Sequence, residues 1–276
     1  MKIDEIIKMI EENNYTIHDI IAEMNQFSMK TVDYDAKKIH ICVCIPINRE
    51  ITAESFTSLM QLYSHLNKHY QVSFTTSIAT YLHEGRSLIT KNSYDIHKKA
   101  PIDYLMWVDS DMVYNVGDFE KCLKMMKKKD LDFLSALYFT KRSKACKPVY
   151  LIKNGEDYKL AENYPPNTLL RVDGVGFGFF LCKAAALFKL HEKYGNKLWK
   201  LENDNSGRMV GEDVIFSRCV TAEGLKMFVW TDICVGHEGG TVNRDVFHAV
   251  NSKEVQDKIQ WEKKAPLIEQ EGVEKC

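Results

Sequence analysis

YLMWVDSD, residues 104–111, decides the fold, because five apolar or aromatic residues run directly into a triplet with two carboxylates. A short run of this kind is typical of a strand that is buried on both faces of a sheet. Asp109 and Asp111 then lie at the strand's carboxyl end, where open parallel sheets bind their ligands. Mg²⁺ and Mn²⁺ prefer carboxylate oxygens and a substrate's phosphates, which favours a metal–diphosphate site. Alternatively, one of the two carboxylates only caps the helix that follows.

Strands and helices alternate on both sides of this stretch, which indicates an α/β fold with a mostly parallel central sheet flanked by helices. Residues 141–170 interrupt the alternation and indicate loops with short strands. Apolar runs predict strands at 39–45, 72–79, 104–108, 131–139, 175–181 and 226–235. Helical spacing predicts helices at 56–66, 86–98 and 119–126, an Ala-rich helix after 181, and a helix from 211 to about 224.

The composition suits one α/β domain with terminal appendages, since 276 residues lie at the upper end of a single domain. We expect a helical appendage at 1–35, a main domain at 36–245 and a helical tail at 246–276, with the terminal helices available to join copies in a homo-oligomer. The net charge of -1 gives no global field toward nucleic acid or an anionic membrane.

The location expected from the sequence is the cytoplasm. The 8 cysteines are scattered without a CxxC pair, which is typical of buried thiols in a reducing compartment. The amino terminus has acidic residues where a signal peptide would be positive, and no long apolar span follows. We therefore expect a protein without a membrane span.

Two further sites complete the candidate chemistry. Glu212 and Asp213 open a helix, where acidic residues are also favoured simply by the helix dipole. His237 follows the last apolar strand among glycines, so it is either a metal ligand or an ordinary loop histidine. Each of these groups lies at the edge of a strand or helix on one rim of the predicted sheet, and their joint occurrence favours a functional site.

The order of these motifs resembles the GT-A glycosyltransferases, nearest to glycosyltransferase family 2, over residues 39–240. The matching positions are Ile45-Pro46, Gly85-Arg86 with Asn92, Trp107 to Asp111, Gly176-Phe177-Gly178, Gly211-Glu212-Asp213 and His237. A DxD at a strand end is weak alone, but it is considerably more specific with a Glu-Asp helix start and a strand-terminal His. The resemblance implies a GT-A type fold, which is the Rossmann-like fold of nucleotide-diphospho-sugar transferases.

The resemblance also implies the parts of the donor site. The residues that would contact the nucleotide-sugar are Pro46, Ile47 and Asn48 at the base, Arg86 and Asn92 at nucleotide or phosphate, Asp109 at the ribose or metal, and Ser110 and Gly176. The donor would be a UDP-sugar, and the cofactor Mn²⁺ or Mg²⁺ held by Asp109, Asp111 and His237. The sequence departs from the family at Ile47, where a polar residue is common, and around Arg86, where the Ala-Arg-Asn sequence of the family is absent.

For catalysis, the resemblance implies that Asp213 takes the proton from an acceptor hydroxyl while Glu212 orients donor or acceptor, so that the anomeric carbon is inverted. The acceptor is open among a glycan, a protein, a small molecule and a modified nucleic acid. Two alternatives to a glycosyltransferase are a sugar nucleotidyltransferase, although the Gly-rich loop after the first strand is absent, and a non-catalytic sugar-nucleotide or glycan-binding module. No Gln-x-x-Arg-Trp motif of a processive synthase is present.

A basic segment follows the predicted strand at 131–139. It contains Lys141, Arg142, Lys144 and Lys147. Such a run is usually a solvated surface, but it also suits binding of the donor diphosphate or of a phosphate-bearing acceptor, because several cations close together bind phosphate well.

Overall fold

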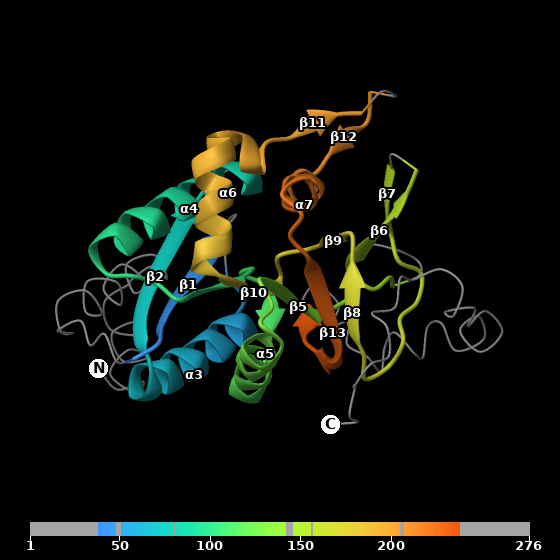
Figure 1. The fold of residues 1–276 in the computed structure, drawn as a ribbon. Coiled ribbons are helices and arrows are strands. Elements are labelled where there is room, and N and C mark those ends of the chain that lie inside the picture. The colour runs from blue at the N-terminus through green and yellow to red at the C-terminus, as the bar shows by residue number, and fades with distance from the viewer. Residues whose placement is uncertain are drawn as a thin grey trace.

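The structure is a computed structural model that describes residues 38–47, 51–79, 81–141, 146–155, 157–204 and 207–237. The predicted appendage at 1–35 and the tail at 246–276 lie outside the described residues, as do the ends of the predicted 36–245 domain. The described ranges form a central sheet with helices on both faces, together with three small sheets (Figure 1).

The central sheet has seven strands, of which five run in one direction. Their spatial order is β2 (Gln71–Ile78), β1 (His40–Ile47), β3 (Tyr104–Val108), β10 (Phe179–Lys183), β5 (Phe133–Leu137), β13 (Met227–Cys234) and β8 (Leu169–Val172). The prediction of a mixed α/β fold with a mostly parallel sheet is therefore confirmed.

Strands β10 and β8 run against their neighbours, which the alternation of strands and helices did not predict. β10 is antiparallel to both β3 and β5, and β8 is antiparallel to β13. A parallel neighbour needs a long crossover, usually a helix. β8 and β10 run in the same direction but are not neighbours in the sheet, and the two-residue strand β9 (Gly174–Val175) joins them without a helix.

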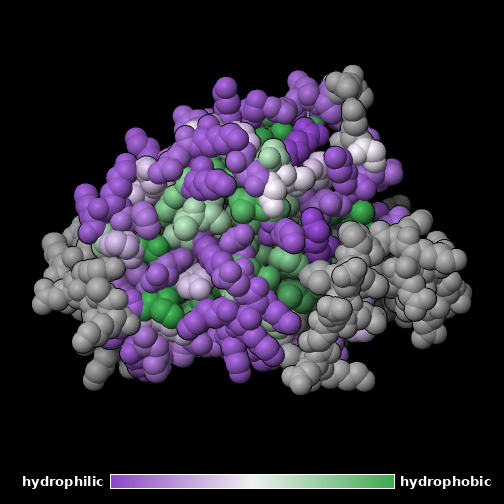
Figure 2. Space-filling view, viewed as in Figure 1, coloured by the Kyte–Doolittle hydropathy of each residue, from purple (hydrophilic) through white to green (hydrophobic). Residues whose placement is uncertain are grey.

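The helices cover both faces because the strands are apolar on both faces. Ile41 and Val43 of β1 join the core under α3 (Ala53–His69) and α5 (Val116–Lys129). Cys42 and Cys44, which alternate with them, join the core on the other face. The elements there are α4 (Leu82–Lys99), α6 (Ala184–Tyr194), the 3₁₀ helix η1 (Gly195–Trp199) and α7 (Glu212–Ala222). In Figure 2, hydrophilic residues cover the outer helices, and apolar residues are visible in the band between them.

Aromatic packing holds η1 between α4 and α7. The Trp199 ring stacks on Phe216 of α7, with ring centroids 4.9 Å apart and an interplanar angle of 15°. Its indole N–H donates to the Thr90 hydroxyl of α4 at 2.9 Å. This packing fixes the start of α7 relative to α4, on which Arg86 lies.

Short strands complete the architecture. They are β4 (Met112–Val113), which pairs with β14 (Gly236–His237); β6 (Tyr150–Asn154), which pairs with β7 (Asp157–Leu160) and β9; and β11 (Glu202–Asn203), which pairs with β12 (Met209–Val210). Within the ranges given above, no helix has the length and apolar character needed to cross a bilayer. Six of the seven described cysteines are buried and Cys234 is half-buried, in line with the expected buried thiols.

Candidate active site

Strand pairing brings the predicted acidic triplet and His237 together. β1 and β3 are parallel with Cys44 opposite Trp107, so that Pro46 and Asp109, two residues further on, lie at the same carboxyl edge. The chain then turns into β4, which pairs with β14 and sets Met112 opposite His237. The Asp109 N–H donates to the Gly178 carbonyl at 3.2 Å, which ties the turn to the loop before β10.

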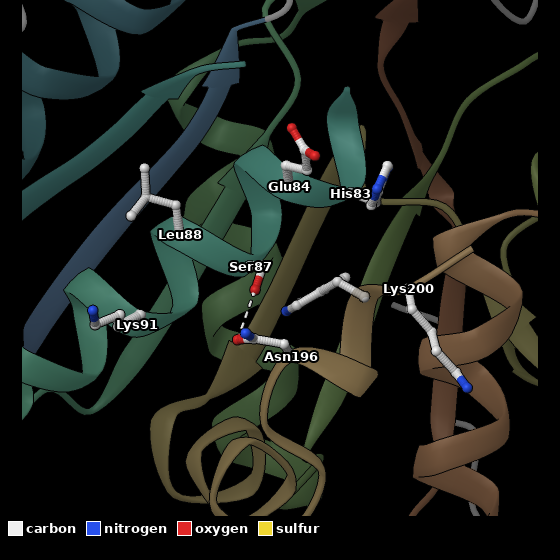
Figure 3. Close-up of a pocket in the computed structure, with 8 residues that line it drawn as sticks. His83, Glu84, Ser87, Leu88, Lys91, Asn196 and Lys200 are labelled. Carbon is white, nitrogen blue, oxygen red and sulfur yellow. Dashed lines mark hydrogen bonds between the residues drawn. The ribbon is translucent and has the colours of Figure 1, made fainter. Parts of the chain in front are cut away.

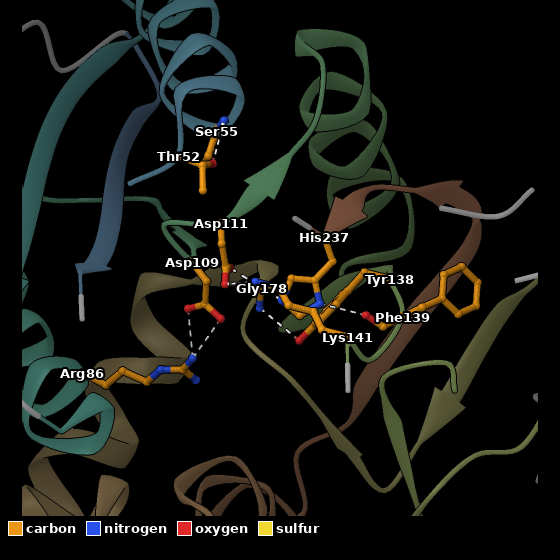
Figure 4. A network of polar contacts seen from close by, with 10 residues as sticks. All are labelled: Thr52, Ser55, Arg86, Asp109, Asp111, Tyr138, Phe139, Lys141, Gly178 and His237. Atoms are coloured by element: carbon orange, nitrogen blue, oxygen red, sulfur yellow. Dashed lines mark hydrogen bonds and ion pairs between the residues drawn. The ribbon is translucent and has the colours of Figure 1, made fainter. Parts of the chain in front are cut away.

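The Asp111 carboxylate lies between two basic side chains (Figure 4). Its Oδ2 pairs with the Lys141 ammonium, and its Oδ1 lies 3.6 Å from His237 Nε2. Partial burial by itself raises the pKa of this carboxyl, but hydrogen bonds from His237 and Lys141 and their charges lower it to about 2. Asp111 is therefore ionised at neutral pH.

His237 is held in one orientation by its neighbours. Its Nδ1–H donates to the Phe139 carbonyl at 2.8 Å, since a carbonyl can only accept. The Tyr138 ring meets the imidazole edge-on, with centroids 5.6 Å apart. Nε2 therefore faces Asp111: with a proton it donates to the carboxylate, and without one it offers the lone pair that a metal-ligating histidine needs.

Asp109 is bound by Arg86 rather than by His237. The Arg86 Nη2 lies 3.0 and 3.3 Å from the two carboxylate oxygens, and Nη1 lies 3.6 Å from Glu212. Arg86 is only 2% exposed, and its guanidinium also lies over the Phe177 ring, with Cζ 4.6 Å from the ring centroid. Burial raises the pKa of Asp109, while the Arg86 charge opposes that rise. Arg86 thus links the end of β3 to the start of α7, and its predicted contact with nucleotide or phosphate stays a prediction.

Glu212 and Asp213 begin α7, as the sequence predicts. Gly211 is the N-cap and has no side chain to cap the helix. Asp213 Oδ1 accepts from the Val214 N–H at 2.8 Å. Burial, followed by the Glu212 charge, raises the pKa of Asp213. A carboxylate with a raised pKa is a stronger proton acceptor, which suits a general base.

The predicted metal ligands fit a divalent ion in part. In the described portion of the chain, no three His, Cys, Asp or Glu side chains are grouped to hold an ion, and Asp109 is engaged by Arg86. Asp111 Oδ1 and His237 Nε2 are 3.6 Å apart. Mg²⁺ holds its ligands at about 2.1 Å, so one ion can contact two atoms that lie within about 4.2 Å of each other. Asp111 and His237 therefore fit a site that phosphate oxygens and water complete.

The other residues predicted to contact the nucleotide-sugar lie in different parts of the structure. Pro46 and Ile47 are buried at the end of β1, and Asn48 lies outside the described residues. The Ser110 carbonyl accepts from the backbone N–H of Thr52, the N-cap of α3, at 3.3 Å. Asn92 follows Arg86 by six residues, about 240° around the helix, so it lies on a different face of α4.

Gly176 and Gly178 have a packing role that the motif did not predict. A Cβ at Gly176 would lie 2.0 Å from the Tyr138 hydroxyl and 2.8 Å from Val149, and one at Gly178 would lie 2.9 Å from the Tyr138 ring. The Tyr138 hydroxyl accepts from the Gly178 N–H at 3.1 Å. Tyr138 therefore supports both the glycine loop and His237. Sequence analysis missed this residue, although two glycines one residue apart are a signal that a large side chain packs against the loop.

We predict that Gly176→Ala lowers the free energy of unfolding by about 1–3 kcal/mol, because the added methyl group overpacks the Tyr138 contact. Urea denaturation measures the loss. Tyr138→Phe removes the clashing oxygen, so the double variant should regain part of it. A double variant whose loss equals the sum of the two single losses would contradict the contact.

Two grooves in the described residues lie away from this cluster. One, of about 360 Å³, lies between α4 and η1, where Ser87 donates to Asn196 at 3.3 Å (Figure 3). The other, of about 610 Å³, follows α5. Neither is lined by a predicted site residue. The polar contacts of Asp111, Arg86 and His237, and not these grooves, therefore define the candidate site.

Comparison with known proteins supports the fold alone. No family model and no curated protein sequence matches the chain. The chain is similar to the crystal structure of GalNAc-T7 with UDP, GalNAc and Mn²⁺, at 13% identity and a TM-score of 0.46. The matched region covers 79% of this chain but only 48% of the GalNAc-T7 chain. The chain is also similar to the crystal structure of A197 from STIV at 16% identity and a TM-score of 0.50, over 75% of this chain and 91% of that one. The chain thus shares its overall mixed α/β fold with A197 from STIV.

Proposed function

We propose that the chain is a GT-A type glycosyltransferase, which moves a sugar from a UDP-sugar to an acceptor hydroxyl. The observation that carries this proposal is the convergence of Asp111 and His237 beside the Asp109–Arg86–Glu212 network at the carboxyl edge of the sheet. Ligands of open α/β sheets bind at this edge.

In this proposal, Asp111 and His237 would hold Mn²⁺ or Mg²⁺, and the bound ion would supply positive charge to the leaving diphosphate. Asp109 is held by Arg86 and faces the donor without being a metal ligand. Pro46 and Ile47 border the nucleoside base, with Ser110 and Gly176 along the donor. The Phe139 carbonyl keeps the His237 Nε2 lone pair directed at the site.

Asp213 acts as the general base. Its carboxylate accepts the proton of the acceptor hydroxyl as that oxygen attacks the anomeric carbon, and the bond to the diphosphate oxygen breaks on the opposite side. Glu212 and Arg86 fix the start of α7, so that Asp213 is presented in one position. A single displacement of this kind inverts the anomeric carbon.

We expect hydrolysis of a UDP-sugar, with water as a slow acceptor, to be detectable with Mn²⁺ and abolished by EDTA. A panel of sugar nucleotides with a coupled assay for released nucleotide diphosphate measures this. Asp111→Ala and His237→Ala should each weaken Mn²⁺-dependent UDP binding, measured by isothermal titration, because each removes a proposed ligand. Asp157→Ala, an exposed carboxylate on β7, is the control.

Activity that persists in EDTA, or parental UDP binding by both ligand variants, would contradict the metal assignment. A sugar nucleotidyltransferase would instead release inorganic diphosphate from UTP and a sugar phosphate. A binding module would bind the nucleotide without releasing UDP. The same panel, supplemented with UTP and sugar phosphates, distinguishes these outcomes.

A further inference from the structure

The feature not used by the proposed reaction is the ion pair between Lys141 and Asp111. The Lys141 ammonium contacts Asp111 Oδ2, on the oxygen opposite to the one that faces His237 (Figure 4). Its side chain is 21% exposed, so this lysine is not an ordinary solvated cation of the basic segment. The Asp111 carboxylate therefore pairs with the Lys141 ammonium through Oδ2 and faces His237 Nε2 through Oδ1.

This arrangement has a consequence for cation binding. Lys141 already neutralises Asp111, and a divalent ion held by Oδ1 and His237 would share the same carboxylate with an ammonium. Like charges at such short range disfavour each other. A nucleotide diphosphate brings negative charge that interacts favourably with both cations, and a diphosphate oxygen can replace Asp111 as the partner of Lys141.

We propose that Lys141 couples cation binding to diphosphate binding. It holds Asp111 in the ligand-free protein, which keeps the affinity for free Mn²⁺ low, and it pairs with the diphosphate when both ligands are present. Mn²⁺ and UDP then strengthen each other's binding by the same factor, as linkage requires. This inference rests on the proposed function, because it assumes that a metal and a nucleotide diphosphate meet at Asp111.

Lys147 provides a matched control within the same basic segment. Its backbone N–H donates to the Thr140 hydroxyl at 3.1 Å, and its carbonyl accepts from the Thr140 N–H at 2.9 Å. These are main-chain contacts, which a side-chain substitution leaves in place. Lys147→Met therefore removes the same charge from the same segment without touching Asp111.

The test is isothermal titration of MnCl₂ in the absence and presence of UDP, and of UDP in the absence and presence of MnCl₂. The parent should bind Mn²⁺ weakly alone and more tightly with UDP. Lys141→Met should bind Mn²⁺ alone about tenfold more tightly and reduce the coupling factor by about tenfold or more, within the range usual for coupled sites. Lys141→Arg, which keeps the charge, and Lys147→Met should keep the parental coupling.

A second comparison keeps the inference testable if charge removal has indirect effects. In an Asp111→Asn background, Lys141→Met should raise the affinity for Mn²⁺ much less than in the parental background, because the shared carboxylate is gone and only the direct repulsion between the two cations is removed; an equal gain in both backgrounds would overturn the inference. Thermal melts of every variant confirm that each one is folded.

Parental coupling in Lys141→Met, or no gain in its affinity for Mn²⁺ alone, overturns the inference. If the parent shows Mn²⁺-dependent UDP binding in that case, the proposed function stands. If the parent binds UDP neither with nor without Mn²⁺, the proposed function fails and this inference fails with it.

Discussion

Replacing Asp213 with Asn should slow sugar transfer by about 10²–10⁴-fold, the usual contribution of a general base, while UDP affinity stays near the parental value. Asn keeps the size of the side chain, and its amide oxygen can still accept from the Val214 N–H. It cannot take a proton. The loss should therefore appear in kcat and hardly in the dissociation constant of UDP.

The pH profile adds a second measurement. Because burial and Glu212 raise the pKa of Asp213, the active carboxylate form is lost as pH falls, and activity should decline on the acid side at a higher pH than for an ordinary Asp. Asp95→Asn, an exposed carboxylate on α4, is the control for a charge change. Near-parental transfer by Asp213→Asn, or a product that keeps the donor's anomeric configuration, would exclude the inverting base mechanism.

Replacing Arg86 with Met should lower the free energy of unfolding at pH 7 by about 3–5 kcal/mol, the usual effect of removing one partner from a buried ion pair. Met retains packing against Phe177 but leaves Asp109 and Glu212 without the cation that lies between them. Urea denaturation measures the change, and Arg171→Met on β8, where the side chain is exposed, is the matched control.

The Arg86 effect should also depend on pH in a definite direction. Burial raises the pKa of Asp109, and loss of the Arg86 charge removes the main influence that lowers it. In Arg86→Met, the folded state therefore binds a proton on Asp109 more readily than the unfolded state, so its stability rises as pH falls toward the unfolded pKa. The deficit relative to the parent should shrink at pH 5. A deficit no larger than that of Arg171→Met would show that the network does not stabilise the fold.

Much of the fold was predictable because buried strands and helix faces place apolar residues at regular spacing in the sequence. The predicted strand at 104–108 is β3 to the residue, and the helix predicted to start at 211 is α7 with Gly211 as its N-cap. The directions of β8 and β10 were not predictable in this way. An apolar run shows that a strand is buried, but the connection before it decides which way it runs.

The candidate site was predictable as a set of residues but not as a set of contacts. Local signals identified Asp109, Asp111 and His237, since each follows an apolar strand. Whether Arg86 binds a phosphate or a carboxylate of its own chain depends on side chains far apart in sequence, and so does the pairing of Lys141 with Asp111. Tyr138 was missed because its function lies in packing against two glycines, which leaves no periodic pattern.

The reversed strand β10 has a consequence for how the chain is assembled. β10 lies between β3 and β5, and it alone joins β2-β1-β3 to β5-β13-β8. Both of its neighbours precede it in the chain, so during synthesis their inner edges have no partner until residues 179–183 emerge. Open strand edges can pair with other chains. Closing the sheet with a late central strand therefore makes folding depend on long-range contacts, which form slowly.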